Sequence, residues 1–123
     1  MKTGYSRHIE RNDCVVRALA NSAHLTYEQA YAECRAEGRR PGCGMRLSKW
    51  LPLFKGWLDL EDYRSLAHVY PTATTLTRHL SRRGGVWLVL FTRHVAVFRD
   101  GEWQDWMSGN RRHRVKAVWR IVE

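Results

Sequence analysis

Three side chains in this sequence could together perform nucleophilic catalysis, namely Cys14, His94 and Asp105. A cysteine nucleophile needs a base that takes its proton, and that base needs a third group that orients it. The histidine and the aspartate lie on either side of Asp100-Gly101. Because Asp-Gly between alternating apolar runs is the strongest short-range signal for a β-hairpin, we expect these two residues on neighbouring strands.

The register of this hairpin decides whether His94 and Asp105 share a face. With two turn residues, the expected cross-strand pairs are Arg99 with Glu102, Phe98 with Trp103, Ala96 with Asp105, and His94 with Met107. Because side chains alternate between the two faces of a strand, His94 and Asp105 are then diagonal neighbours on one face. A slip of one residue would put them on opposite faces and leave a surface histidine and an edge aspartate.

Cys14 is expected at the start of a buried helix, because Asn12 or Asp13 suits an N-cap and apolar residues follow at helical spacing up to Ala23. A helix N-terminus stabilises a thiolate through its macrodipole and its unpaired N–H groups. The backbone N–H of Cys14 and the side-chain amide of Asn12 could also donate to the oxyanion of an acyl-transfer reaction. The alternative is that Cys14 is a small buried apolar residue without chemistry.

The elements that must position these residues are helices in the first half of the chain and strands in the second. Thr26 to Gln29 form a capping box that opens a second helix, which should stop at Gly38. We further expect a short helix at 45–51 that Pro52 ends or kinks, short strands at 57–60 and 67–70, a helix at 75–81, and strands at 86–91 and 115–122. The unbroken apolar run at 86–91 favours a central strand that is buried on both faces. This order predicts one α+β domain over residues 1–123, with N-terminal helices packed on a C-terminal antiparallel β-sheet.

The composition limits the class of protein. A chain of 123 residues with 44% hydrophobic residues can bury a core and is not expected to be disordered. No apolar run reaches the length of a membrane span and no signal-peptide core is present at the N-terminus, so we expect a cytoplasmic protein that does not enter a membrane. An odd count of three cysteines suits a reducing cytosol, or one thiol that is kept free for chemistry. Cys34 and Cys43 lack a second close pair, so we expect no zinc site there, and Cys34 reads as a packing residue. We expect no other metal and no cofactor.

The charge points to a polyanionic partner or to a plain basic surface. Lys and Arg number 21 against 12 for Asp and Glu, which gives a net charge of +9, and 17 of the basic residues are arginine. This balance suits nucleic acid or an acidic protein, although a soluble basic surface needs neither. Arg111, Arg112 and Arg114, with Trp106 nearby, form the basic cluster that we expect to contact such a partner. Its alternative interpretation is a solvated surface run.

The segments around the three candidate catalytic residues resemble the papain-like cysteine peptidase superfamily, and are most similar to its minimal C39-like branch and to small phage-encoded members. The likeness is carried by Asp-Cys-Val-Val-Arg-Ala-Leu at 13–19 and by His-Val-Ala-Val, Asp-Gly and Asp-Trp within 94–106. It does not extend over residues 38–84. The resemblance implies a papain-like fold, no cofactor, a protein or peptide amide as the substrate, and the host cytoplasm as the location if the chain is phage-encoded.

The same resemblance implies a role for each site residue. Cys14 would be the nucleophile, His94 the general base and then the acid, and Asp105 the group that orients the histidine. Papain-like enzymes usually carry a Gln before the Cys for the oxyanion hole, and here Asn12 takes that place because no Gln precedes Cys14. Val15 stands where C39-like peptidases often have Gly.

Three interpretations follow from these patterns. The first is a cysteine peptidase-like enzyme that hydrolyses an amide, or that uses the same triad for deamidation or transglutamination. The second is a basic, non-enzymatic binding module for nucleic acid or a host protein, in which Cys14 only packs. The third is a papain-like fold that has lost its activity and is kept for binding another protein.

Overall fold

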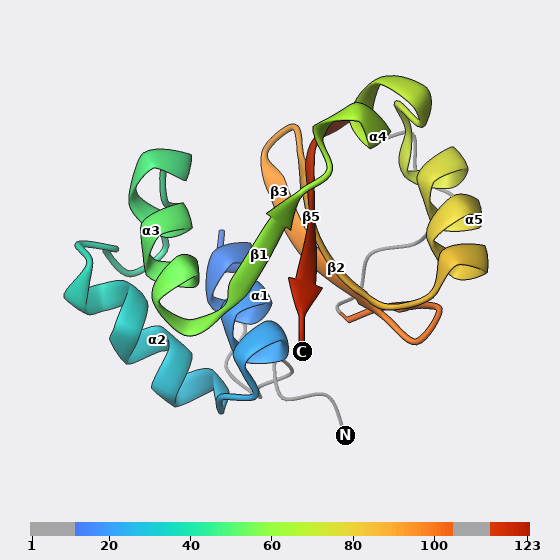
Figure 1. Ribbon diagram of the computed structural model, residues 1–123. Coiled ribbons are helices and arrows are strands. Elements are labelled where there is room, and N and C mark those ends of the chain that lie inside the picture. Colours follow the sequence, from blue (N-terminus) through green and yellow to red (C-terminus); the bar gives the residue numbers. More distant parts are fainter. Residues whose placement is uncertain (1–11, 105–113) are drawn as a thin grey trace. The chain divides into compact units, whose positions relative to one another are not determined.

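The computed structural model describes residues 12–104 and 114–123. Helices and one antiparallel β-sheet make up the structure (Figure 1), so the predicted α+β class is confirmed. The chain divides into two compact units, Met1–Leu58 and Asp59–Glu123, which we call the first and the second unit. None of the helices in the described part of the chain combines the length and the apolar character that a membrane span requires.

The first unit is helical and contains α1 (Cys14–Ala23), α2 (Tyr27–Ala36) and α3 (Leu47–Trp57). α1 begins at Cys14, as the sequence predicts. The predicted capping box of α2 is also confirmed, because the Gln29 N–H donates to Thr26 Oγ1 at 3.1 Å and the Thr26 N–H donates to Gln29 Oε1 at 2.9 Å. Gly38 follows the end of α2 with a φ of 101°, a backbone conformation that glycine adopts without strain.

Pro52 does not end the helix near residue 51, because α3 continues through the proline to Trp57. The alternative, that Pro52 kinks the helix, stays a prediction. Proline removes one helical hydrogen bond, but the side chains around it hold this helix together. Trp50 and Phe54 are both buried, and their ring centroids lie 5.0 Å apart. Beyond the proline, Trp57 Nε1 donates to Glu33 Oε1 at 3.3 Å, which fastens the end of α3 to α2.

The second unit holds the sheet and two helices. Its elements are β1 (Asp59–Asp62), α4 (Arg64–Val69), α5 (Ala73–Arg83), β2 (Val86–Phe91), β3 (His94–Arg99), β4 (Glu102–Trp103) and β5 (Val115–Val122). The strand order is β1-β5-β2-β3-β4, and every neighbouring pair is antiparallel. β2 is the central strand and its residues are buried on both faces, as predicted, except for the half-buried Leu90. β5 matches the predicted strand at 115–122.

In this unit, one predicted element is of another type and two predicted elements have other boundaries. The expected strand at 67–70 is wrong, since residues up to Val69 belong to α4 and this turn of helix buries Leu66 in the core. The strand expected at 57–60 begins later, at Asp59. The helix expected at 75–81 is longer, because its N-cap is Thr72, whose Oγ1 accepts from the Thr75 N–H at 3.4 Å.

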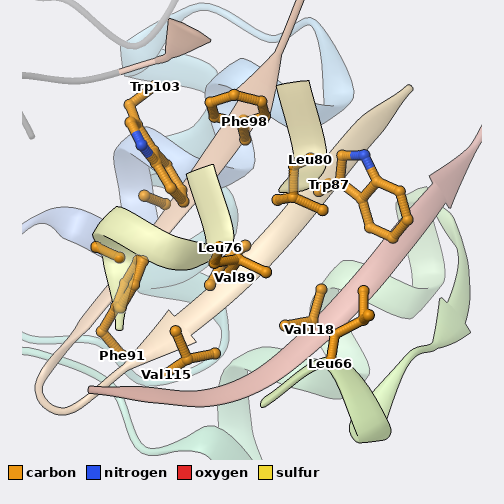
Figure 2. Packing of buried hydrophobic residues seen from close by; sticks show 12 residues of the cluster. Leu66, Leu76, Leu80, Trp87, Val89, Phe91, Phe98, Trp103, Val115 and Val118 are labelled. Atoms are coloured by element: carbon orange, nitrogen blue, oxygen red, sulfur yellow. The ribbon is translucent and has the colours of Figure 1, made fainter. Parts of the chain in front are cut away.

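The core of the second unit lies between the two helices and one face of the sheet (Figure 2). α4 and α5 contribute Leu66, Ala73, Leu76 and Leu80, and the strands contribute Trp87, Val89, Phe91, Ala96, Phe98, Trp103, Val115 and Val118. Figure 2 shows the Trp103 ring beside Phe98, and the two ring centroids lie 4.9 Å apart. Trp103 Nε1 donates to Thr77 Oγ1 at 3.0 Å, which joins the short β4 to α5.

Candidate functional site

Cys14 is the first residue of α1, and its thiol is half-buried and not part of a disulfide. The helix positions it there because Asp13 takes the N-cap position and apolar residues bury the helix that follows. The Asp13 side chain makes no capping hydrogen bond. Its carboxylate therefore does not compete with Cys14, or with a bound oxyanion, for the N–H groups of the first turn.

The Asp13 carboxylate is instead bound in a buried network between α1 and α2. Asp13 and Arg17 are each only 2% exposed. Arg17 Nε donates to both carboxylate oxygens at 3.1 Å, and the Tyr27 hydroxyl donates to Oδ2 at 2.9 Å. The Arg17 guanidinium also lies over the Tyr27 ring, 5.9 Å from its centroid. This network compensates the charge next to Cys14 and fixes the start of the helix that carries it.

Asn12, the residue proposed for the oxyanion hole, holds a loop at the start of α1. Its backbone has a φ of 56°, and its side-chain Nδ2 donates to the carbonyl of Gly42 at 3.0 Å. This bond links the helix start to a segment 30 residues away, in the glycine-rich loop that follows Gly38. One N–H of the Asn12 amide is thus used within the protein, and its contribution to an oxyanion hole stays a prediction.

His94 is the first residue of β3, directly after the tight turn that joins β2 to β3. It pairs with Phe91 on β2, and the two rings are nearly parallel, with centroids 6.3 Å apart and an interplanar angle of 27°. The imidazole is half-buried. The sheet therefore holds His94 at the end of a strand, where one side of the ring is supported by an aromatic neighbour.

The predicted hairpin register is confirmed as far as the structure describes it. Phe98 pairs with Trp103 and Arg99 with Glu102. Asp100 and Gly101 have φ values of 53° and 80°, as the two central residues of a type I′ turn require. Phe98 and Trp103 share the core face of the sheet with Ala96. Alternation along β3 puts His94 on that same face.

Several predicted site residues lie outside the described part of the chain: Asp105, Trp106, Arg111 and Arg112. The pairing of Ala96 with Asp105 and the His94–Asp105 hydrogen bond therefore stay predictions. Arg114 is described, and its side chain is exposed next to an isolated β-bridge with Thr72.

The other two cysteines have different environments. Cys34 is fully buried in α2, and its burial raises the pKa of the thiol to about 12, with smaller and opposite effects from Arg39 and Glu33. It is a packing residue, as predicted, because a thiol with this pKa stays protonated near neutral pH. Cys43 is exposed in the loop that Asn12 holds. Across residues 12–104 and 114–123, no group of three or more His, Cys, Asp or Glu side chains is arranged to bind a metal ion.

Sequence reasoning overlooked Asp13, Arg17 and Tyr27 as a unit that fixes the helix of Cys14. The spacing of four residues between Asp13 and Arg17 was the available signal, since such pairs face each other on a helix. The contribution of Tyr27 comes from another helix and has no local signal. No protein-family model, curated protein or solved structure matches this chain.

Proposed function

We propose that this chain is a cysteine peptidase-like acyl hydrolase or transferase on a papain-like fold, with Cys14 as its nucleophile and a protein or peptide amide as its substrate. The observation that carries the proposal is the position of Cys14. Its half-buried thiol is at the first residue of a helix that Asp13 does not cap, and the adjacent Asp13 charge is matched by Arg17 and Tyr27. A packing cysteine needs neither the exposure nor this arrangement.

The proposed reaction follows from the residue types. His94 takes the thiol proton of Cys14, and the sulfur attacks the carbonyl carbon of the amide. The oxyanion accepts a hydrogen bond from the Cys14 backbone N–H and from the second N–H of the Asn12 amide. His94 then gives its proton to the departing amine, which leaves a thioester on Cys14. Water or another amine attacks the thioester carbonyl, and His94 removes the proton of that nucleophile. The C–S bond then breaks, the acid or the new amide leaves, and the Cys14 sulfur takes the proton back from His94.

Asp105 is proposed to orient the ring of His94 by accepting a hydrogen bond from it. The confirmed pairs at Phe98 and Arg99 support this role, because continuing the same register by two residues puts Asp105 opposite Ala96. His94 and Asp105 are then diagonal neighbours on one face, within reach of each other. The location we propose is the cytoplasm, or the host cytoplasm for a phage-encoded chain.

A basic binding module on the same or a degraded papain-like fold is the second candidate. The net charge of +9 favours it. In this candidate Cys14 has no chemical role, so the two proposals differ in the reactivity that they expect from its thiol.

The experiment is a mass-spectrometric time course of alkylation by iodoacetamide near neutral pH. We expect Cys14 to be modified faster than the more exposed Cys43, because the helix N-terminus and the His94 imidazolium both stabilise a thiolate. Cys34 should not react while the protein is folded. His94→Ala should slow the modification of Cys14 strongly, and Asp105→Ala should slow it less because it removes only the orienting group.

His68→Ala is the matched control, since His68 is an exposed histidine on α4 and its loss should leave the rate at Cys14 unchanged. Modification of Cys43 ahead of Cys14 would contradict the proposal. So would a Cys14 rate that does not respond to His94→Ala, and either result would leave the binding module as the better account.

A further inference from the structure

α5 carries two arginines, Arg78 and Arg82, on the side that faces away from the core, and a third, Arg83, is its last residue. Ala73, Leu76 and Leu80 are the buried residues of this helix. Arg78, Arg82 and Arg83 are exposed, and we call these three residues the α5 arginine cluster. Because Arg78 and Arg82 are four residues apart, they lie next to each other on the same side of the helix.

Among residues 12–104 and 114–123, no acidic side chain forms an ion pair with the α5 arginine cluster. α5 itself contains no Asp or Glu. Among the described residues of this unit, the ion pairs are Arg64 with Asp62 and Arg99 with Glu123, and none includes a residue of the cluster. The helix macrodipole favours cations in the last turn, which accounts for Arg82 and Arg83 but not for Arg78 in the middle of the helix.

A fourth guanidinium lies at the C-terminal end of the same helix. Gly85 follows the C-cap Gly84, and a Cβ at Gly85 would lie 3.6 Å from Arg120 Nε. Arg120 is exposed on β5 and pairs in register with Glu61 of β1, without an ion pair among the described residues. Positive charge therefore continues from α5 onto the sheet.

One residue of the cluster, Arg83, is held in place by aromatic side chains rather than by a carboxylate. The Arg83 guanidinium lies over Tyr63 and Trp87, 4.8 Å and 5.4 Å from the ring centroids. Next to it, His79 stacks on Tyr70 at 4.3 Å. Burial lowers the pKa of His79, and Arg83 and Arg82 lower it further, which is the effect expected of an uncompensated positive potential.

We propose that the α5 arginine cluster binds the phosphate backbone of duplex nucleic acid without reading its sequence. Arginine suits this role because its planar guanidinium binds phosphate oxygens through two hydrogen bonds. At about 1.5 Å of rise per residue, Arg78 and Arg82 are separated by about 6 Å along the helix axis. Each strand of a duplex carries one phosphate for about every 3.4 Å of the duplex axis, so two guanidiniums at this separation can contact different phosphates of one duplex.

The same surroundings argue against a single strand as the partner. Proteins that bind single strands stack bases on exposed aromatic rings. The rings that flank α5 are buried or half-buried, and they already contact Arg83, His79 or the core: Tyr63, Tyr70, Trp87 and Trp103. The proposal is independent of the chemistry proposed for Cys14.

The test is the binding of a fluorescein-labelled DNA duplex of mixed sequence, followed by fluorescence anisotropy between about 50 and 200 mM NaCl. Each phosphate contact contributes about 0.9 to the slope of log K against log salt, so Arg78→Gln/Arg82→Gln should reduce that slope by about 1.8. Over this range the affinity of the unmodified protein should fall about 12-fold more than that of the variant. Both residues are exposed, so the variant should fold normally.

The matched control is Arg46→Gln/Lys49→Gln, which removes the same charge from exposed positions of the first unit. It should leave the slope unchanged, and Cys14→Ser should bind the duplex as the unmodified protein does. An equal loss of slope in both double variants would overturn the proposal in favour of a general effect of net charge. Absence of salt-dependent binding would also overturn it, as would equal affinity for a single strand. Displacement of the duplex by polyglutamate at equal charge would indicate an acidic protein partner instead.

Discussion

Removing the carboxylate of Asp13 should strongly destabilise the first unit, because it breaks a buried ion pair. Asp13→Ala leaves Arg17 with its guanidinium at 2% exposure and without the two contacts that Nε makes at 3.1 Å. It also removes the acceptor of the Tyr27 hydroxyl. Truncating one partner of a buried ion pair typically costs about 3 to 5 kcal/mol, because the remaining charge stays buried and uncompensated.

The assay is urea denaturation followed by circular dichroism, because the first unit is helical and its loss removes much of the helical signal. Asp62→Ala is the matched control, since it deletes the partner of Arg64 in an ion pair whose side chains are 81% and 49% exposed. Such exposed pairs contribute about 0 to 1 kcal/mol. We therefore expect a clear separation between the two alanine variants.

A double variant tests whether the buried charge is the cause. Arg17→Met in the Asp13→Ala background replaces the buried guanidinium, which has lost the Asp13 carboxylate, with an apolar side chain. This second substitution should recover part of the lost stability. The reasoning is refuted if Asp13→Ala costs no more than Asp62→Ala. It is also refuted if the double variant is no more stable than Asp13→Ala alone.

Two further predictions concern single residues of the first unit. Cys34 has a folded-state pKa of about 12 against an ordinary value of 9.0, so the stability that it contributes is present below pH 9.0 and is lost as the pH rises towards 12. Cys34→Ala should flatten the fall of the urea midpoint over this range while Cys43→Ala does not, and an unchanged slope in Cys34→Ala would contradict this. Pro52→Ala should stabilise the unit by about 1 to 3 kcal/mol, because Ala supplies an N–H for the carbonyl of Ser48 in an exposed stretch of α3. A urea midpoint at or below that of the unmodified protein would show that the proline costs the helix nothing.

The features that the sequence predicts well are those that depend on neighbouring residues. The Asp100-Gly101 turn needs two residues with positive φ, and the capping box of Thr26 needs a partner three positions away. Both can be recognised without knowing what packs on them. The helix start at Cys14 and the strand at His94 belong to this group.

The features that it misses depend on packing between distant residues. Residues 67–70 have strand-like composition, yet Leu66 packs in the core and makes this stretch a turn of helix. Pro52 is tolerated because Trp50 and Phe54 are buried on either side of it. Such tertiary contacts outweigh local preference, and no short pattern in the chain encodes them.

The candidate site also combines a feature that neighbouring residues specify with one that depends on distant contacts. The placement of Cys14 at a helix start follows from residues next to it, whereas a meeting of Cys14 with His94 depends on contacts that no local pattern specifies. Among the basic residues, a cluster along the chain can likewise be recognised from the sequence, whereas a cluster on one side of a helix cannot. The run at 111–114 is conspicuous in the sequence, while Arg78 and Arg82 become a pair only once the buried side of α5 is known.

The position of β5 in the sheet has a consequence for synthesis on the ribosome. β5 lies between β1 and β2 and pairs with both, so neither strand has this neighbour until residues 115–122 have been made. α1, α2 and α3 are translated first, and their mutual contacts lie within the first 58 residues. The sheet must therefore be completed late, while β1 and β2 expose unpaired edges to other chains. Translation that pauses before Val115 would leave a nascent chain with finished helices and an open sheet, which is the stage at which a chaperone would be needed most.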